Sequence, residues 1–184
     1  SVAARADKYK SLYQAIKDAV GNKAQILYAK GSNLMYDSVM EKNATMFGRE
    51  MRDKRSAKEM LDEALKVAAD ADVIVAAVGE SSEMSGECSS RSNLDMPDAQ
   101  HDLLTALKNT GKPIVLLYFA GRATVITWES QNFPAILNVW FGGSEAGDAI
   151  CDVLFGAKSP SGKLTVTMPK SVGQIPIYYS HLNT

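Results

Sequence analysis

The apolar residues of this chain follow two alternating patterns, and the first of them has helical spacing. Apolar positions three and four apart, bounded by residues that favour helix ends, predict four helices. These are expected over residues 6–20, from Ser56 onward, from Pro97 to Gly111 and from Ser144 to Gly156. Ser56 is followed three residues later by Glu59, which is the signature of a capping box.

The second pattern consists of short apolar runs between the helices. The runs at residues 72–78, 114–119 and 135–141 are almost continuous, which is typical of strands buried on both faces. A shorter run at residues 24–29 predicts a further strand, and the polar–apolar alternation at residues 163–168 predicts an edge strand. Residues 33–55 are weakly patterned, which predicts a long connection with room for one short helix.

Strands separated by single helices predict an α/β fold. We expect one domain over residues 1–184, a three-layer α/β/α sandwich whose sheet is mostly parallel with one antiparallel edge strand. Right-handed crossovers place the loops after successive parallel strands at one edge of the sheet, where open α/β sheets bind ligands. Residues 79–96, 120–124 and 142–145 are therefore predicted to share one rim.

Composition and charge exclude several classes of protein. Of the 184 residues, 46% are hydrophobic and 22% are charged, which suits a globular domain. Twenty Lys and Arg residues against 21 Asp and Glu give a net charge of -1, and no basic stripe indicates a nucleic-acid partner. No stretch approaches the roughly 20 apolar residues of a membrane span. The chain begins directly in helix-like sequence and stops without a capping element, which predicts a fragment of a larger protein, so the lack of a signal peptide at Ser1 carries little information.

Cysteine and histidine positions indicate no metal centre. Cys88 and Cys151 permit a disulfide by number alone, but Cys151 falls in an apolar helical pattern, which favours two free thiols. His101 and His181 are separated from each other and from the cysteines, so the spacing of a metal site is missing. We expect no metal and no cofactor.

The chemistry of this chain is expected in the loop at residues 79–96. It has 18 residues, whereas the loop between a strand and a helix usually has about 2–6. It carries three glutamates, one arginine and many hydroxyl groups. This composition suits recognition of a sugar and catalysis by a carboxylic acid. It equally suits an ordinary solvated loop, so composition alone leaves both possibilities open.

Several motifs in fixed order resemble one enzyme family. The segment Ser85-Gly86-Glu87-Cys88-Ser89-Ser90-Arg91 resembles the acid/base loop in the second, C-terminal domain of glycoside hydrolase family 3. The motifs NVWFGGSEAG, ICDVLFG, PSGKL and PKSVGQIP follow at residues 138–147, 150–156, 160–164 and 169–176 as they do in that family. Residues 178–184 resemble the stretch that comes next in bacterial periplasmic β-glucosidases. The resemblance spans about residues 8–184.

The resemblance implies a role for one glutamate. Family members have an upstream barrel domain with an Asp nucleophile, and the second domain donates a loop bearing the general acid/base, a position that matches Glu87. This implies a retaining β-glycosidase that hydrolyses terminal β-linked glucosyl residues, periplasmic or secreted, and a chain that is inactive without its barrel. Two positions depart from the family pattern. Cys88 stands where members carry varied small residues, and Gly121-Arg122-Ala123 lacks a common Pro, so the resemblance does not fix the orientation of Arg122.

The other charged residues of the loop keep alternative interpretations. Glu80 directly follows a strand, so it is expected either to bind sugar hydroxyls or to brace the loop through backbone N–H groups. Glu83 is expected to be solvated. Arg91 is expected to pair with Glu87 or Glu83 or to face water. We assign Glu80 and Arg91 to substrate binding and Glu87 to catalysis.

Two other functions compete with the enzyme hypothesis. The first is a non-catalytic α/β module that binds a carbohydrate at its rim. The second is a nucleotide-binding, flavodoxin-like protein, which is disfavoured because no glycine fingerprint follows the first strand. The turn Gly142-Gly143-Ser144 at a helix start has a geometry suited to an anion, but it lacks the Lys and the spacing of a phosphate loop, so a tight turn is the simpler interpretation.

Overall fold

The structure, a computed structural model, describes residues 9–45, 48, 50–178, 180 and 182. The chain divides into two compact units. One comprises Ser1–Leu27 and Phe141–Leu164, and the other comprises Tyr28–Trp140 and Thr165–Thr184. The prediction of a single domain stays a prediction.

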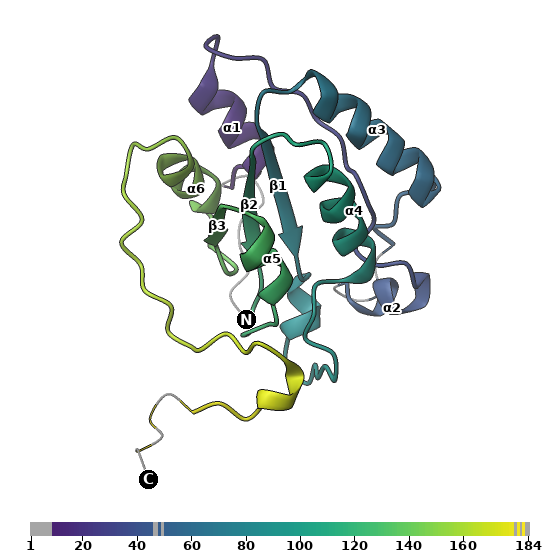
Figure 1. The fold of residues 1–184 in the computed structure, drawn as a ribbon, viewed down its shortest axis with the longest axis vertical. Coiled ribbons are helices and arrows are strands. Elements are labelled where there is room, and N and C mark those ends of the chain that lie inside the picture. The colour runs from purple at the N-terminus through teal and green to yellow at the C-terminus, as the bar shows by residue number, and fades with distance from the viewer. Residues whose placement is uncertain (1–8, 46–47, 49, 179, 181, 183–184) are drawn as a thin grey trace. The chain divides into compact units, whose positions relative to one another are not determined.

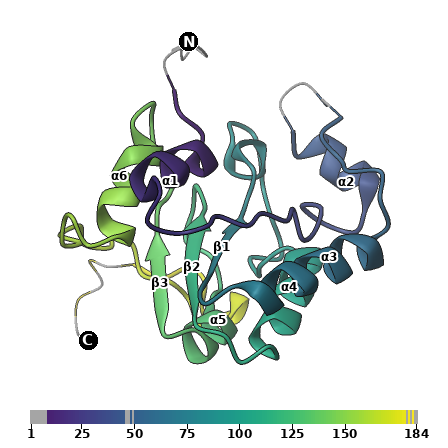
Figure 2. The ribbon, with the colours of Figure 1, turned by 90° about the horizontal axis from the view of Figure 1, so that it is seen from above.

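The larger unit is built on a parallel sheet (Figures 1 and 2). Its strands are β1 (Ile74–Gly79), β2 (Ile114–Phe119) and β3 (Ala135–Asn138), in the order β1-β2-β3. The bounds of β2 match the prediction. β3 ends earlier than predicted because Trp140, with a φ of 51°, leaves the extended conformation. The α/β fold class is confirmed, whereas the three-layer arrangement stays a prediction.

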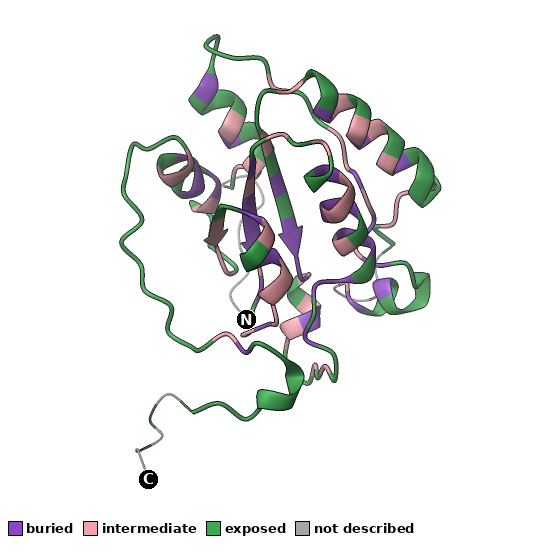
Figure 3. Ribbon diagram, viewed as in Figure 1, coloured by how far each residue is buried: buried purple, intermediate pink, exposed green. Residues whose placement is uncertain are grey.

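The helices α3 (Ala57–Asp70), α4 (Asp98–Lys108) and α5 (Thr127–Asn132) lie on one side of this sheet (Figure 2). The capping box predicted at the start of α3 is confirmed, because Ser56 and Glu59 bond to each other's backbone. Strand β2 is the centre of the core, and Figure 3 shows its buried positions. Apolar side chains of the sheet and helices pack there, including Ala64, Val78, Leu104, Leu107, Leu116 and Phe133.

Two short helices lie outside the main predicted pattern. α2 (Ser38–Asn43) is the short helix for which the long connection had room, and Asp37 caps it. α5 was not predicted, because its six residues carry no apolar stripe and no side chain caps its start. Such short helices depend on tertiary packing more than on sequence pattern.

In the described residues of the smaller unit, two helices pack together, α1 (Leu12–Val20) and α6 (Ala146–Leu154). α1 begins later than predicted, with Ser11 as its cap, and residues 6–8 of the predicted helix lie outside the described residues. The predicted cap at Ser144 is wrong. Glu145 precedes α6 and no side-chain hydrogen bond caps that helix.

Two predicted strands are also wrong. Residues 24–29 and 163–168 form no strand, so the antiparallel edge strand expected over residues 163–168 is not observed. Most residues of both segments are exposed, and no ladder pairs them with any strand of the described chain. An alternating or apolar run is stabilised as a strand only when a neighbour accepts its backbone hydrogen bonds, and sequence pattern does not reveal that neighbour.

Candidate functional site

Two of the three predicted rim segments meet at the carboxyl edge of the sheet. The loop after β1 and the loop after β2 are joined by a parallel bridge between Asp95 and Val125. The Val125 N–H donates to the Leu94 carbonyl oxygen at 2.9 Å. The third segment, Gly142 to Glu145, belongs to the smaller unit and stays a prediction.

Glu80 anchors the long loop where it leaves β1. Its side chain is completely buried, and its backbone N–H donates to the Phe119 carbonyl oxygen at 2.8 Å. Its carboxylate accepts hydrogen bonds from the Ser85 hydroxyl at 2.9 Å and from the Gly121 N–H at 3.4 Å. A buried carboxylate needs such partners because burial removes its hydration. Glu80 therefore ties the loop to the end of β2.

Arginines from two segments balance the Glu80 charge. Arg91 forms an ion pair with Glu80, and it also donates to the Asp95 carbonyl oxygen at 3.1 Å. Arg122 Nε lies 3.8 Å from Glu80 Oε1. The expected pairing of Arg91 with Glu87 or Glu83 is therefore wrong. Spacing did not reveal the partner, because the loop folds back to bring residues 80 and 91 together.

Glu87 lies on a turn at the outside of this anchored loop. The turn follows the 3-10 helix η3 (Ser82–Ser85), and the Ser89 N–H closes it by donating to the Gly86 carbonyl oxygen at 3.1 Å. Glu87 is exposed, and among the described residues it has no hydrogen bond or ion pair. Cys88, also exposed, adopts a φ of 62°. The carboxylate of Glu87 is thus free to meet a ligand.

Arg122, from the loop after β2, forms hydrogen bonds with the backbone of the 79–96 loop. Its Nη2 donates to the Met84 carbonyl oxygen and, at 3.3 Å, to the Ser89 carbonyl oxygen. Its Nε is buried and has no hydrogen-bond partner among the described atoms. Sequence reasoning gave Arg122 no role. The available signal was its place three residues after the end of β2, at the edge where the loops meet.

A buried tyrosine supports the loop after β2. The hydroxyl groups of Tyr118 and Thr124 are 2.7 Å apart, and both side chains are fully buried. Burial raises the pKa of Tyr118 to about 12, so its hydroxyl stays neutral at physiological pH. The support under the loop therefore adds no charge to the site.

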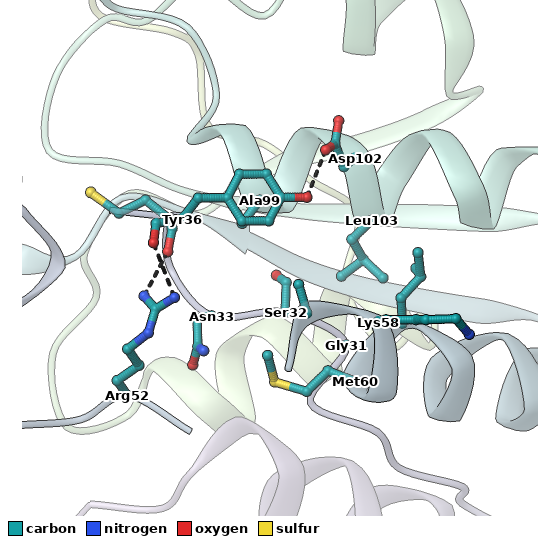
Figure 4. Close-up of a pocket in the computed structure, with 13 residues that line it drawn as sticks. Gly31, Ser32, Asn33, Tyr36, Arg52, Lys58, Met60, Ala99, Asp102 and Leu103 are labelled. Atoms are coloured by element: carbon teal, nitrogen blue, oxygen red, sulfur yellow. Dashed lines mark hydrogen bonds between the residues drawn. The ribbon is translucent and has the colours of Figure 1, made fainter. Parts of the chain in front are cut away.

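The pocket drawn in Figure 4 is separate from this loop. It has a volume of about 200 Å³ and lies between α3, α4 and the segment around Gly31 to Tyr36. The Tyr36 hydroxyl donates to Asp102 at 2.6 Å, and Arg52 donates to the Tyr36 carbonyl oxygen at 3.0 Å. No residue of the 79–96 loop lines it. We therefore do not assign it to the candidate site.

Neither a metal centre nor a membrane span is found in the described part of the chain. Its residues include no group of three or more His, Cys, Asp or Glu side chains suited to hold a metal ion. His181 lies outside this part. Within the same residues, no helix has the length and apolar character needed to cross a bilayer. Cys88 and Cys151 are both free, as predicted.

Residues 1–184 match the Glycosyl hydrolase family 3 C-terminal domain. The chain belongs to this family. Over its whole length the family 3 domain is 49% identical to a periplasmic β-glucosidase of Salmonella typhimurium, of which it covers 24%. Over 93% of its length it is 36% identical to a β-xylosidase of Formosa agariphila, of which it covers 21%. The chain thus spans about a quarter of the length of these curated relatives.

Solved structures agree with this family membership. A β-glucosidase from Erythrobacter marinus superposes on 93% of the family 3 domain with a TM-score of 0.72 and 26% identity, and 24% of that chain is covered. A β-glucosidase from Listeria innocua in complex with gluconolactone superposes on 67% with a TM-score of 0.63 and 40% identity, and 18% of that chain is covered. The α/β fold described above is therefore shared with β-glucosidases.

Proposed function

We propose that this family 3 domain supplies the general acid/base of a retaining β-glycosidase and that Glu87 is that residue. The observation that carries the proposal is the position of its carboxylate. Glu87 is exposed on a turn at the carboxyl edge of the sheet, and buried Glu80 holds the base of that loop. The relatives named as glycosidases support an enzyme domain over a non-catalytic carbohydrate-binding module.

In the proposed reaction, Glu87 acts twice. A carboxylate nucleophile on a second domain attacks the anomeric carbon, and the protonated Glu87 donates its proton to the departing glycosidic oxygen. Glu87, now a carboxylate, then removes a proton from water as the water oxygen attacks the anomeric carbon of the glycosyl-enzyme and the bond to the nucleophile breaks. The nucleophile is released, the anomeric configuration is retained, and Glu87 regains its proton.

The nucleophile is proposed to come from an upstream barrel domain of the same polypeptide. In retaining enzymes the carboxyl groups of the nucleophile and of the acid/base stand about 5–5.5 Å apart. The turn that bears Glu87 must therefore lie against the active site of the barrel. On this proposal the 184-residue chain alone hydrolyses no aryl β-glucoside. Robust hydrolysis by the purified chain would contradict the two-domain account.

The proposed substrate is a terminal β-linked glucosyl residue, and the proposed location is the periplasm or the cell exterior. The periplasmic β-glucosidase of Salmonella typhimurium supports both. The β-xylosidase relative makes a β-xyloside the natural comparison. Comparing kcat/KM for aryl β-glucosides and aryl β-xylosides with the complete enzyme tests this preference.

Glu80 and Arg91 were assigned to substrate binding, and that assignment stays a prediction. Complete burial of the Glu80 side chain and its pairing with Arg91 give more support to the other interpretation, in which Glu80 braces the loop. A carboxylate that is already surrounded by protein donors has little capacity left for sugar hydroxyls.

Leaving-group dependence in the complete enzyme tests the role of Glu87. Glu87→Gln is expected to slow aryl glucosides with poor leaving groups by about 100- to 10,000-fold, because those oxygens need a proton, and to affect good leaving groups much less. Azide is expected to restore a Glu87→Ala variant by attacking the glycosyl-enzyme without base assistance. Glu83→Gln is the matched control from the same loop. Equal losses on all substrates for Glu87→Gln would move the role to Glu80 or Glu83.

A further inference from the structure

We infer that Arg122 is a positioning residue, which holds the turn of Glu87 in place for proton transfer. The inference rests on the proposed function of Glu87. Arg122 lies in the loop after β2, outside the segment that bears Glu87, and nothing in the family motifs assigns it a role.

The hydrogen bonds of Arg122 bracket the proposed acid. Met84 lies three residues before Glu87 and Ser89 lies two residues after it, and Arg122 Nη2 donates to the carbonyl oxygens of both. One guanidinium nitrogen therefore joins the two ends of the turn. The Ser89 hydroxyl reinforces the closure by donating to the Glu83 carbonyl oxygen at 2.6 Å.

On its other side the guanidinium faces the Glu80 carboxylate without a hydrogen bond. Arg122 Nε lies 3.8 Å from Glu80 Oε1, and Glu80 is itself fixed by Ser85, Gly121 and Arg91. The side chain of Arg122 is only 24% exposed, so water competes weakly for its donors. The turn is thus connected through Arg122 to the buried end of the sheet.

Arginine suits this position better than lysine. A planar guanidinium can direct Nη2 at two carbonyl oxygens while Nε faces a carboxylate, whereas a compact ammonium group cannot cover both sides at once. Arg122→Lys is therefore expected to restore only part of the function that Arg122→Met removes.

Position matters because proton transfer is sensitive to distance. The acid must lie within about 2.6–3.2 Å of the oxygen that it protonates. A displacement of about 1 Å at a reacting group can lower the rate about 100-fold. Without Arg122, the carbonyl oxygens of Met84 and Ser89 lose this donor and accept hydrogen bonds from water instead. Glu87 then samples positions from which it cannot reach the leaving oxygen.

Hydrogen exchange on the 184-residue chain tests the structural step. The Gly86 and Ser89 N–H groups are bonded within the turn, at 3.4 Å and 3.1 Å respectively. In Arg122→Met their exchange is expected to accelerate about tenfold, the equivalent of one lost hydrogen bond. Arg55→Met is the matched control, because Arg55 pairs with Asp53 and Glu63 and has no bond to the loop. Unchanged exchange in Arg122→Met would overturn the inference.

A double-mutant cycle in the complete enzyme tests the functional step. Arg122→Met is expected to lower kcat/KM about 10- to 100-fold for poor leaving groups, with a much smaller loss for good ones. In a Glu87→Gln background it is expected to add less than about twofold, because its effect acts through Glu87. A merely structural role predicts the same loss on every substrate and an additive loss in the double mutant, and either result would overturn the inference.

The two proposals fail in distinguishable ways. If Glu87→Gln gives the expected leaving-group dependence and Arg122→Met does not, only the role of Arg122 is wrong. If Glu87→Gln lowers kcat/KM equally for all substrates, the proposed acid/base role of Glu87 is wrong, and the positioning role of Arg122 is wrong with it.

Discussion

Replacing Gly79 with alanine is expected to destabilise the larger unit strongly. Gly79 ends β1, opposite Phe119, with a φ of 136°, a conformation that residues with a side chain rarely adopt. An added Cβ would lie 1.9 Å from the Phe119 carbonyl oxygen and 2.7 Å from its carbonyl carbon. Both atoms belong to backbone, so no side-chain movement relieves the contact.

The expected loss follows from three contributions. Backbone strain at this φ costs about 1–3 kcal/mol, and overpacking against the neighbouring strand costs a further 1–3 kcal/mol or so. The lower entropy of the unfolded alanine chain offsets about 0.4–1 kcal/mol. The net decrease in the free energy of unfolding is about 3 kcal/mol, which corresponds to a fall of roughly 6–12 °C in Tm for a chain of this size.

Two other glycines provide the controls. Gly111 has a φ of 71° but open space where an added Cβ would lie, so Gly111→Ala is expected to lower the free energy of unfolding by only about 1 kcal/mol. Gly162 has open space where an added Cβ would lie and no positive φ, so Gly162→Ala is expected to raise the free energy of unfolding by up to about 0.5 kcal/mol. Urea unfolding followed by circular dichroism measures all three variants. If Gly79→Ala unfolded at the same urea concentration as Gly162→Ala, the close approach of β1 to Phe119 would be refuted.

Three further predictions concern other parts of the chain. The hydrogen bond to Asp102 raises the pKa of Tyr36 to about 12, so the stabilising effect of this hydrogen bond is complete below about pH 10 and is lost as the pH rises through 12. An ultraviolet titration in which Tyr36→Phe left the late-titrating absorbance unchanged would contradict this. A thiol reagent is expected to modify exposed Cys88 quickly and buried Cys151 slowly, because burial raises the pKa of the Cys151 thiol. Peptide mapping that found the reverse order would refute this difference in exposure. Ser56→Ala is expected to lower the free energy of unfolding by about 1 kcal/mol through loss of the α3 cap, and an unchanged urea midpoint would show that the cap contributes nothing.

The core of the fold was predictable from local pattern. Continuous apolar runs located β1 and β2, and the serine–glutamate spacing located the start of α3, because these signals depend on neighbouring residues alone. The strands expected at residues 24–29 and 163–168 failed because strand formation requires a partner elsewhere in the chain. The helix α5 was missed for a related reason, since a short helix is stabilised by what packs against it.

The candidate site divides in the same way. The motif around Glu87 was recognisable, and the length of its loop marked it as unusual. The pairing of Glu80 with Arg91 and the hydrogen bonds of Arg122 could not be predicted from the sequence, because they depend on how the loop folds back on itself. The φ of 62° at Cys88 is a further example, since a cysteine gives no local indication of a left-handed conformation.

The attachment of Glu80 to the end of β2 has a consequence for the order of assembly. The Gly121 N–H that reaches Glu80 lies 41 positions further along the chain, and Arg122 follows it directly. A partly folded chain that contains α3, β1 and α4 but has not yet added β2 lacks these partners. The segment that bears Glu87 is therefore expected to become ordered only after β2 joins the sheet, among the later events in the folding of this unit.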